Sequence, residues 1–389
     1  MRILLNDYSG HAFTYELGLK ISSYHNVFYC YADFFQAPKA DFNSKKKDSR
    51  KISTNPISIK KKFNKYNFFT RIGREISYGE GVINLIKKSK PQLVICANTP
   101  LNPLLNILKY CKRNNIKTIF WMQDIYAEAI KKLLNKNFYI LGTLASFYFH
   151  LLEKECEKIA DQIIIISNDF KKFLSKESLK KTHYIENWSA YDKLNKNYKN
   201  YFKKKLNPQN KFCLIYSGTI GMKHDSEIFF NILEKLPNIL IIISSEGKYA
   251  EKIKNHANKK KINLKLIKWV EPKYFYSFLS MADAFLVTLN KEASEISVPS
   301  KIYSYLSVGK PILGVMPKNN LGAKKIIQCK SGYIISPDNT DTLVDKIKNI
   351  IASKNKSQKF IINKQKYLND KKNSLSKLEQ IINFLSNDK

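Results

Sequence analysis

The stretch KFCLIYSGTIGMKHD, residues 211–225, joins a short apolar run to a turn that contains two glycines. An apolar run of this density predicts a strand that is buried on both faces, as in a parallel sheet. The next stretch, DSEIFFNILEKL, has apolar residues at helical spacing, so strand, glycine turn and helix make one βα unit. Such a unit indicates an α/β protein with a parallel sheet.

The same alternation of strand and helix patterns runs along most of the chain. Strand-like runs are RILLN, NVFYCY, PQLVICA, KTIFWMQD and ADQIIIIS before residue 210, and NILIIISSEG, NLKLIKWV and ADAFLVTL after it. Because the pattern restarts near residue 210, we expect two Rossmann-like domains with parallel sheets.

The domain boundaries follow from composition. The polar, lysine-rich residues 187–210 predict a linker, which gives an N-terminal domain over residues 1–195 and a C-terminal domain over 205–355. A second lysine-rich segment, residues 41–67, predicts a long basic loop inside the first domain. Residues 360–389 return to a helical pattern and are expected to form a C-terminal helix.

The formal net charge of the 389-residue chain is +35, which has two explanations. One is a partner that carries phosphates, either a nucleic acid or an anionic membrane surface. The other is a bias toward AT-rich codons, and it carries more weight because lysine far outnumbers arginine. Even a biased surface is drawn to anionic lipid, by about 1 kcal/mol for each well-placed lysine.

The six cysteines are scattered, without a CxxC pair or a zinc-like cluster, which is typical of a reducing compartment and predicts a cytoplasmic protein. Cys96 and Cys213 lie in apolar runs and are expected in the core.

No signal peptide and no membrane-spanning run is visible. Residues 137–155 come closest, and predict a buried helix or one that touches lipid; the first is favoured because interfacial helices usually show a clear polar face.

Candidate site residues lie in the loops after the strands, since ligands of open parallel sheets bind beyond the carboxyl ends of the strands. Each also has a structural explanation: a surface histidine, a helix-capping aspartate, a solvated lysine or a packed tryptophan. The candidates in these loops are Gly10, His11, Asp124, Gly218, Thr219, Gly221, Lys223, Ser245, Glu246, Gly247, Trp269 and Val270.

A further candidate lies in VPSKIYSYLSVGKPIL, residues 298–313. Ser300 is expected to cap a helix that Gly309 and Pro311 end. Lys301 then lies at the helix N-terminus, where a cation is unfavourable unless an anionic ligand binds there. A lysine that extends into water is the alternative.

The chain lacks a D-x-D pair and a G-x-S-x-G motif, which argues against metal-dependent and hydrolase chemistry, and no metal or cofactor is expected.

Six motifs together resemble glycosyltransferase family 4: RILLNDYSGHAF, ADFFQAPK, FWMQDIYAEAI, YSGTIGMKHD, MADAFLVTL and SVPSKIYSYLSVGKPILGV. They are most similar to the branch that builds bacterial surface polysaccharides, including colanic-acid and O-antigen transferases. The resemblance implies the GT-B fold, with two facing Rossmann-like domains, a donor site mainly in the second, and a C-terminal helix that crosses back to the first. It also implies retaining, metal-independent transfer from a nucleotide-diphosphate sugar.

The resemblance also implies roles for residues. Lys301, Lys223 and the Gly218–Gly221 turn would neutralise the departing diphosphate. Gly10 would let its loop approach the sugar, and Asp124 would face the sugar or the acceptor. The family usually has two glutamates eight positions apart, where this chain has Ile296 and Ser304. Ser304, or Glu295 next to Ile296, is therefore expected to replace the glutamate that normally binds the ribose.

The sequence thus favours transfer of a sugar, with an N-acetylated deoxy-amino sugar as one candidate, from a UDP-sugar to a lipid-linked saccharide. The protein would be cytoplasmic and peripherally associated with the inner face of the cell membrane. One alternative is a UDP-sugar epimerase or hydrolase of the same fold, for which Asp124, His11 and Glu295 are the candidate acid–base residues. The other is a non-enzymatic nucleic-acid-binding protein, which the absence of an RNP-like motif disfavours.

Overall fold

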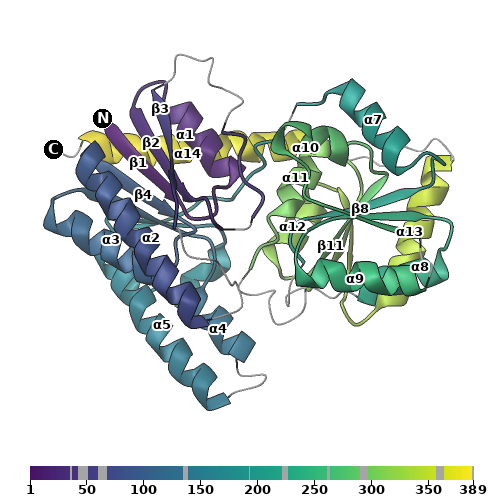
Figure 1. Cartoon of the computed structure of the whole chain (residues 1–389), viewed down its shortest axis with the longest axis horizontal. Coiled ribbons are helices and arrows are strands. Elements are labelled where there is room, and N and C mark those ends of the chain that lie inside the picture. The colour runs from purple at the N-terminus through teal and green to yellow at the C-terminus, as the bar shows by residue number, and fades with distance from the viewer. Residues whose placement is uncertain are drawn as a thin grey trace. The chain divides into compact units, whose positions relative to one another are not determined.

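The computed structural model describes residues 1–35, 37–42, 51–59, 68–134, 139–191, 193–220, 227–260, 263–289, 297–355 and 363–387. The chain divides into two compact units. In Figure 1 the first is coloured purple to teal, with a yellow C-terminal segment, and the second is coloured teal to yellow. The first unit is Met1–Asn187 with Asn373–Lys389, and the second is Trp188–Lys372.

The first unit is built on a seven-stranded parallel sheet with the order β3-β2-β1-β4-β5-β6-β7. The strands are β1 (Arg2–Asp7), β2 (Asn26–Ala32), β3 (Ile52–Ile57), β4 (Leu93–Ala97), β5 (Lys117–Met122), β6 (Gln162–Ile165) and β7 (Thr182–Tyr184). The strand order reverses between β1 and β4, which is the position where open α/β sheets bind ligands.

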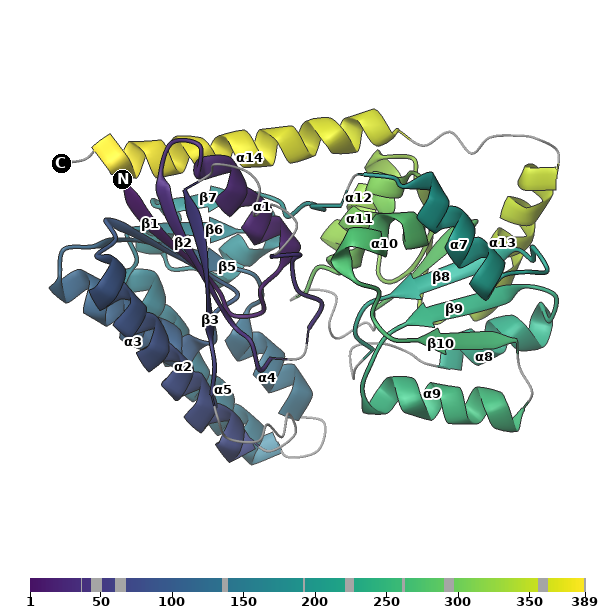
Figure 2. The same ribbon diagram turned by 45° about the horizontal axis from the view of Figure 1, so that its top comes forward.

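Helices cover both faces of this sheet, which is why β4 is apolar throughout and why every residue of β1 after Arg2 is buried. In Figures 1 and 2, α2, α3, α4 and α5 lie on one face, and α1 lies with the C-terminal part of α14 on the other. The helices are α1 (Ala12–Ile21), α2 (Phe68–Ser89), α3 (Leu101–Arg113), α4 (Tyr126–Leu134), α5 (Tyr139–Ile159), the 3₁₀ helix η1 (Asn168–Phe173), α6 (Lys176–Leu179) and α14 (Lys364–Asn387).

The predicted basic loop over residues 41–67 is wrong in its centre, where β3 forms the edge strand of the sheet. Ile52 pairs with Val27, and Ile57 pairs with Ala32. The six-residue strand, ISTNPI, contains a proline and three polar residues, which weakens its strand pattern. Pairing with β2 overrides this low propensity, because an edge strand needs only one hydrogen-bonded neighbour.

The second unit contains a six-stranded parallel sheet with the order β10-β9-β8-β11-β12-β13, reversing between β8 and β11. Its strands are β8 (Cys213–Ser217), β9 (Leu240–Ser244), β10 (Leu264–Ile267), β11 (Ala284–Thr288), β12 (Ile312–Val315) and β13 (Gly332–Ile335). Its helices are α7 (Lys196–Leu206), α8 (Glu227–Lys235), α9 (Lys248–Lys259), α10 (Pro272–Leu279), α11 (Lys301–Val308), α12 (Leu321–Gln328) and α13 (Thr340–Asn355).

Two separate cores lie on the two faces of this sheet, and alternate residues of β8 enter each. Cys213 and Ile215 pack with α10, α11 and α12, whereas Leu214 and Tyr216 pack with α8, α9 and α13. This alternation follows from the twofold periodicity of a strand. Together the two units form the architecture that the sequence predicts, two α/β domains with parallel sheets.

The polar segment that we predicted as a linker contains α7 instead. Asn195 caps this helix, since its Oδ1 accepts hydrogen bonds from the backbone N–H groups of Asn197 and Tyr198 at 3.0 and 3.4 Å. Phe202 packs against the core of the second unit. Leu206, at the end of the helix, is buried in the same core, so two apolar contacts and a good cap hold a helix that is rich in lysine.

The six cysteines are all buried and free, and Cys96 and Cys213 belong to the core as predicted. Within the described parts of the chain, no helix combines the length and the apolar character needed to cross a bilayer. In those same parts, no group of three or more His, Cys, Asp or Glu side chains has a metal-binding arrangement.

Candidate functional site

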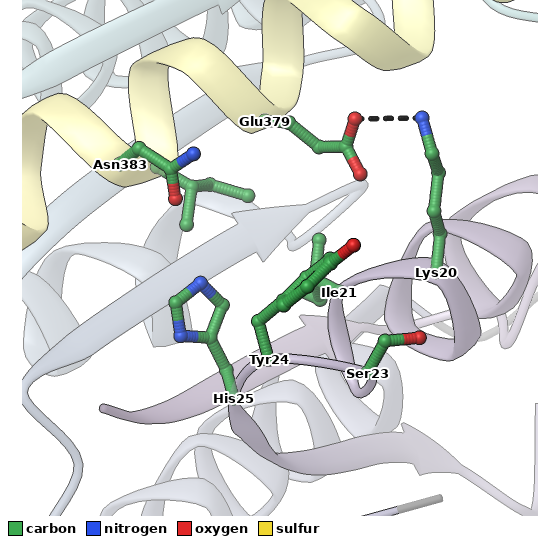
Figure 3. Close-up of a pocket in the computed structure, with 8 residues that line it drawn as sticks. Lys20, Ile21, Ser23, Tyr24, His25, Glu379 and Asn383 are labelled. Atoms are coloured by element: carbon green, nitrogen blue, oxygen red, sulfur yellow. Dashed lines mark hydrogen bonds and ion pairs between the residues drawn. The ribbon is translucent and has the colours of Figure 1, made fainter.

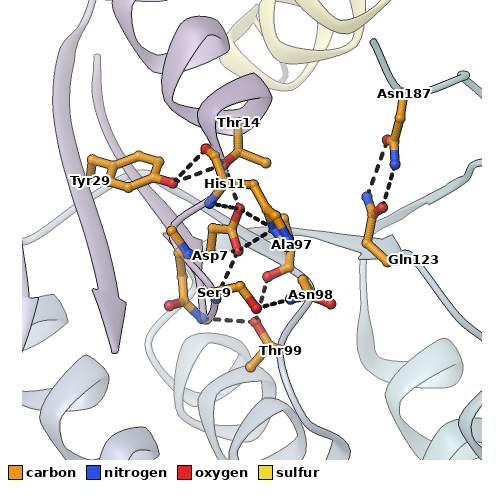
Figure 4. A network of polar contacts seen from close by, with 12 residues as sticks. Asp7, Ser9, His11, Thr14, Tyr29, Ala97, Asn98, Thr99, Gln123 and Asn187 are labelled. Atoms are coloured by element: carbon orange, nitrogen blue, oxygen red, sulfur yellow. Dashed lines mark hydrogen bonds and ion pairs between the residues drawn. The ribbon is translucent and has the colours of Figure 1, made fainter. Parts of the chain in front are cut away.

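A buried aspartate organises the loop after β1, at the point where the strand order of the first sheet reverses (Figure 4). Asp7 is the last residue of β1 and is fully buried. Its carboxylate accepts hydrogen bonds from the backbone N–H groups of Ser9, Gly10 and His11 at 3.0, 3.2 and 3.0 Å. The Thr14 hydroxyl lies 2.5 Å from Asp7 Oδ2. These contacts satisfy a buried charge that would otherwise be costly.

The His11 ring completes this cluster and is its solvent-facing group. Its Nδ1 lies 3.2 Å from both carboxylate oxygens of Asp7, and 33% of its side chain is exposed. Burial lowers the pKa of His11, but the charge and hydrogen bond of Asp7, with a further contribution from Asp124, raise it above the usual value. Burial likewise raises the pKa of Asp7, but the His11 charge and the hydrogen bonds of His11 and Thr14 lower it overall. Both shifts favour the ionised forms, an imidazolium beside a carboxylate.

Gly10 provides the tight turn that the sequence predicts. Its φ is +71°, and its N–H donates to the Asp7 carbonyl at 3.0 Å. A Cβ at Gly10 would lie 3.3 Å from the Tyr31 ring and 3.4 Å from the Phe42 ring. A larger residue would therefore strain the backbone and crowd both rings.

The ends of β1 and β4 are joined by side-chain hydrogen bonds. Asn98, which follows β4, donates to Ser9 at 2.5 Å, and Asn6 donates to Thr99 at 2.9 Å. Asp124 lies in the loop after β5, where its charge acts on His11. The first turn of α4 is held by Glu153, whose carboxylate accepts from the Tyr126 N–H at 3.0 Å.

Lys301 begins α11 in the second unit and turns its ammonium toward β8. Its Nζ donates to the Tyr216 hydroxyl at 2.8 Å and lies 4.4 Å from the centre of the Tyr216 ring. Burial lowers the pKa of Lys301 to about 7. A lysine that is half protonated near neutral pH would become fully charged beside an anion, so the position suits a phosphate-binding group.

Gly218 lies directly against this lysine. It follows β8 with a φ of +135°, and a Cβ there would lie 2.9 Å from Lys301 Cε. Its N–H donates to the Ser244 carbonyl at 3.0 Å, and the preceding Ser217 N–H donates to the Tyr305 hydroxyl at 2.7 Å. Because Gly218 has no side chain, the space next to its Cα is open, and the side chain of Lys301 occupies it. Thr219 follows it, and its carbonyl accepts from the Tyr216 hydroxyl at 3.1 Å.

Three buried polar groups near the carboxyl edge of this sheet have no hydrogen-bond partner among the described residues. They are the hydroxyls of Ser245 and Thr288 and the indole N–H of Trp269. Ser245 directly follows β9, and Thr288 ends β11. Buried polar groups normally have a partner, so their position at the ligand-binding edge is consistent with a polar ligand.

The remaining predicted residues have more limited roles. Glu246 accepts from the Trp269 backbone N–H at 3.2 Å, and Val270 packs against the core. A Cβ at Gly247 would meet no atom within 4 Å. Ser304 Oγ lies 3.4 Å from Ser189 Oγ.

The expected cap at Ser300 is absent, because this residue has α-helical dihedral angles and its side chain makes no capping bond. A preceding turn, with the Ile302 N–H donating to the Pro299 carbonyl at 3.1 Å, takes over that role. Gly309, in contrast, ends α11 in the left-handed conformation as predicted. The predicted site residues Gly221, Lys223 and Glu295 lie outside the described residues.

A pocket of about 460 Å³ lies in the first unit, away from the loop that carries Asp7 and His11 (Figure 3). It is lined by the end of α1, the residues just before β2 and the side chains Glu379, Ile382 and Asn383 of α14. It therefore belongs to the amino-terminal edge of the first sheet, opposite the loops that carry Asp7 and His11. The 2.6 Å ion pair between Lys20 and Glu379 lies at its wall. It contains none of the predicted site residues.

Sequence reasoning missed Asp7, Thr14 and Asn98 in the first unit and Thr288 in the second. A signal for Asp7 was present, because an aspartate that ends a strand before Ser-Gly commonly accepts hydrogen bonds from the turn that follows. Thr288 lies in an apolar run and carries no such signal.

One family model matches part of the chain. Residues 197–367 match the family described as "Glycosyl transferases group 1". No curated protein matches the chain.

Solved structures match over the full length of the chain. HepE from Anabaena in complex with UDP and glucose has 14% identity and a TM-score of 0.69, covering 99% of both chains. Sucrose-phosphate synthase from Thermosynechococcus elongatus has 13% identity and a TM-score of 0.73, covering 99% of this chain and 98% of its own. UDP-GlcNAc 2-epimerase from Neisseria meningitidis has 12% identity and a TM-score of 0.61, covering 98% of this chain and 100% of its own. The predicted GT-B fold is thereby confirmed.

Proposed function

We propose that the chain is a retaining, metal-independent glycosyltransferase. It moves a hexosyl or N-acetylhexosaminyl group from a UDP-sugar to a lipid-linked saccharide during synthesis of a bacterial surface polysaccharide, such as an O-antigen or a capsule. The family match over residues 197–367 and the likeness to HepE, which was solved with UDP and glucose, support the reaction class and the donor. The observation that carries the proposal is the Lys301 ammonium beside Gly218 and Tyr216 at the carboxyl edge of the second sheet.

Lys301 supplies the main electrostatic contribution in this proposal. Negative charge grows on the diphosphate as the bond to the sugar breaks, and a cation placed in advance stabilises that charge. The pKa of about 7 means that about half of the free protein carries the ammonium at neutral pH. A bound diphosphate favours protonation, so the site becomes fully cationic when the donor is present. The helix N-terminus of α11 adds to the same field.

Other groups of the second unit contribute to donor binding. The Ser245 and Thr288 hydroxyls and the Trp269 N–H, which lack partners among the described residues, would hydrogen-bond the nucleoside. Ser304 or Glu295 would take over part of the ribose contact that a glutamate makes in the resembling family.

The first unit supplies His11, with Gly10 and Asp124 beside it. The imidazolium, held by Asp7, would donate a hydrogen bond to the sugar or to a phosphate oxygen. Gly10 keeps the turn narrow enough for close approach of the ligand. Asp124 would accept a hydrogen bond from a hydroxyl of the sugar or the acceptor.

The acceptor and the cellular site follow from the proposed pathway. A lipid-linked saccharide is reached at a membrane, so the protein would associate peripherally with the inner face of the cell membrane. A net charge of +35 supports such an association with anionic lipid.

The direct test is a transfer assay with a panel of UDP-sugars and a lipid-linked saccharide extract as the acceptor. We expect one donor to label the lipid fraction, with the anomeric configuration of the donor kept in the product, as NMR of that product would show. An inverted product contradicts the retaining mechanism, and failure of every UDP-sugar to bind contradicts the donor assignment.

An epimerase or hydrolase acting on a UDP-sugar is the second candidate. The likeness in fold to UDP-GlcNAc 2-epimerase favours it, although its TM-score of 0.61 is lower than that of HepE at 0.69. Incubation with donor alone separates the two activities. An isomerised UDP-sugar or a stoichiometric release of free sugar would favour the second candidate, whereas an unchanged donor favours transfer.

A further inference from the structure

Helix α5 exposes four of its large apolar side chains. Leu144, Phe147, Tyr148 and Leu151 are 63%, 61%, 48% and 52% exposed. Their spacing of i, i+3, i+4 and i+7 places all four on one face of the helix. We refer to these four residues as the α5 stripe. The sequence favoured a buried helix over residues 137–155, and the exposure of this face corrects that prediction.

The inner face of the same helix is the more polar one. Ser146, Glu153 and Glu157 are buried, beside Phe149 and Cys156. Ser146 donates to the Ala127 carbonyl at 3.2 Å, and Glu153 accepts from Tyr126. Burial raises the pKa of Glu153 to about 7. The helix is therefore firmly attached to its unit, while four large apolar side chains face away from it.

Contacts within the first unit fix the position of Tyr148 in the stripe. The Tyr148 hydroxyl donates to Asn102 of α3 at 2.8 Å, and its ring packs edge-on against Phe149 at 5.2 Å. No acidic residue occurs in residues 139–152. In Figure 1, α5 lies on the outer side of the helical layer formed with α2 and α3.

We propose that the α5 stripe inserts into the headgroup region of an anionic phospholipid bilayer. An apolar helical face with aromatic side chains suits the boundary between headgroups and acyl chains. Charge favours lipid over a second copy of the chain, since each copy carries a net charge of +35 and two copies repel. The inference rests on the proposed function, because a lipid-linked acceptor is reached at such a surface.

The experiment measures binding of the full chain to vesicles by sedimentation. The vesicles contain phosphatidylcholine alone, or phosphatidylcholine mixed with phosphatidylglycerol. We expect binding to the mixed vesicles, and a loss of about tenfold or more in the partition coefficient for the double variant Phe147→Ser/Leu151→Ser. The double variant Leu144→Ser/Leu151→Ser, checked for folding by circular dichroism, provides a second measurement.

Phe384→Ser is the matched control, because Phe384 is a 58% exposed phenylalanine of α14 in the same unit. It should bind vesicles as the unmodified chain does. Equal loss in this control, or no loss in either stripe variant, overturns the proposal. So does concentration-dependent dimerisation of the unmodified chain that the stripe variants abolish without any vesicle binding.

A separate measurement distinguishes this proposal from the proposed function. UDP binding in the absence of vesicles should be equal in the unmodified chain and in the stripe variants. Vesicle binding without UDP binding would support the proposal for the α5 stripe and contradict the donor assignment. UDP binding with no vesicle binding would overturn the proposal for the α5 stripe and leave the donor assignment intact.

Discussion

The ammonium of Lys301 and the hydroxyl of Tyr216 are joined by a hydrogen bond of 2.8 Å between the start of α11 and strand β8. The same ammonium lies 4.4 Å from the centre of the tyrosine ring. A neutral hydroxyl and a ring face replace only part of the water that the ammonium loses, which is why the pKa of Lys301 falls to about 7. The second unit thus places a lysine that can gain a proton near neutral pH beside a turn without a side chain.

Removal of this cation should slow transfer without unfolding the protein. We expect Lys301→Ala to lose about 2–4 kcal/mol of transition-state stabilisation, the range found for loss of one positioned electrostatic contact. The measurement is kcat/KM for sugar transfer. Lys348→Ala is the control, because Lys348 is 60% exposed and lies 3.9 Å from Asp345, a surface pair that contributes little. Equal activity of both variants would contradict the role of Lys301.

Binding of UDP should be linked to proton uptake. The pKa of Lys301 is about 7 in the free protein, and a bound diphosphate raises it. At about pH 8 the free lysine is therefore mostly neutral and takes up a proton on binding, so UDP affinity falls as the pH rises above that pKa. Calorimetry in buffers of different ionisation enthalpy measures the uptake. Lys301→Ala should abolish it, and a proton uptake that survives this substitution assigns the titration to another group.

Gly218→Ala should disturb Lys301 rather than the fold as a whole. The new Cβ would lie 2.9 Å from Lys301 Cε, at a φ of +135°. We expect weaker UDP binding, and little further loss when Lys301→Ala is added, because both substitutions remove the same contact. Gly309→Ala controls for backbone strain alone, since Gly309 has a φ of +76° and lies at the end of α11. Additive losses in the double variant would refute the shared mechanism.

Asp7→Asn should lower the pKa of His11 below its usual value of 6.5. The Asp7 charge and hydrogen bond raise this pKa against the effect of burial, so burial dominates once the charge is removed. NMR titration of the imidazole provides the measurement. Asp124→Asn should lower the pKa of His11 by less, since the charge of Asp124 raises that pKa less than the charge of Asp7 does. An unchanged titration in Asp7→Asn would show that the pair is not ionised.

The same pair predicts how stability depends on pH. The lowered pKa of Asp7 contributes stability above 3.8 that is lost on acidification, and the raised pKa of His11 contributes stability below 6.5 that is lost as the pH rises. Asp7→Asn should therefore cost most between these values, about 1–3 kcal/mol in the free energy of unfolding. Urea unfolding across this range measures the difference, and a cost that does not vary with pH would contradict the linkage.

Local patterns in the sequence were sufficient for most of the strands and helices, though not for β3 and α7. Apolar runs such as LVICA can be buried only between two layers of helices, so they predict parallel sheets before any contact is known. The turns at Gly10 and Gly309 were predictable for a similar reason, because a positive φ favours glycine strongly.

Features that depend on partners distant in sequence were not predictable. The strand β3 exists because β2 offers an unpaired edge, and its own residues give a weak pattern. Helical spacing in residues 137–155 identified a helix, but periodicity cannot tell which face turns inward when a carboxylate such as Glu153 finds a buried partner. The predicted helix cap at Ser300 was wrong, because the chain enters α11 through a turn that sequence spacing does not reveal.

The first unit is interrupted in the sequence, since it consists of Met1–Asn187 and Asn373–Lys389. The second unit is therefore an insertion into the first, rather than a domain appended to it. A truncated chain that ends at Asn187 would lack the fully buried Leu378 and Ile382 and the Glu379 partner of Lys20. Expressed alone, it would expose an apolar groove along its sheet and would be expected to aggregate, whereas supplying residues 373–389 as a separate peptide should restore a folded half.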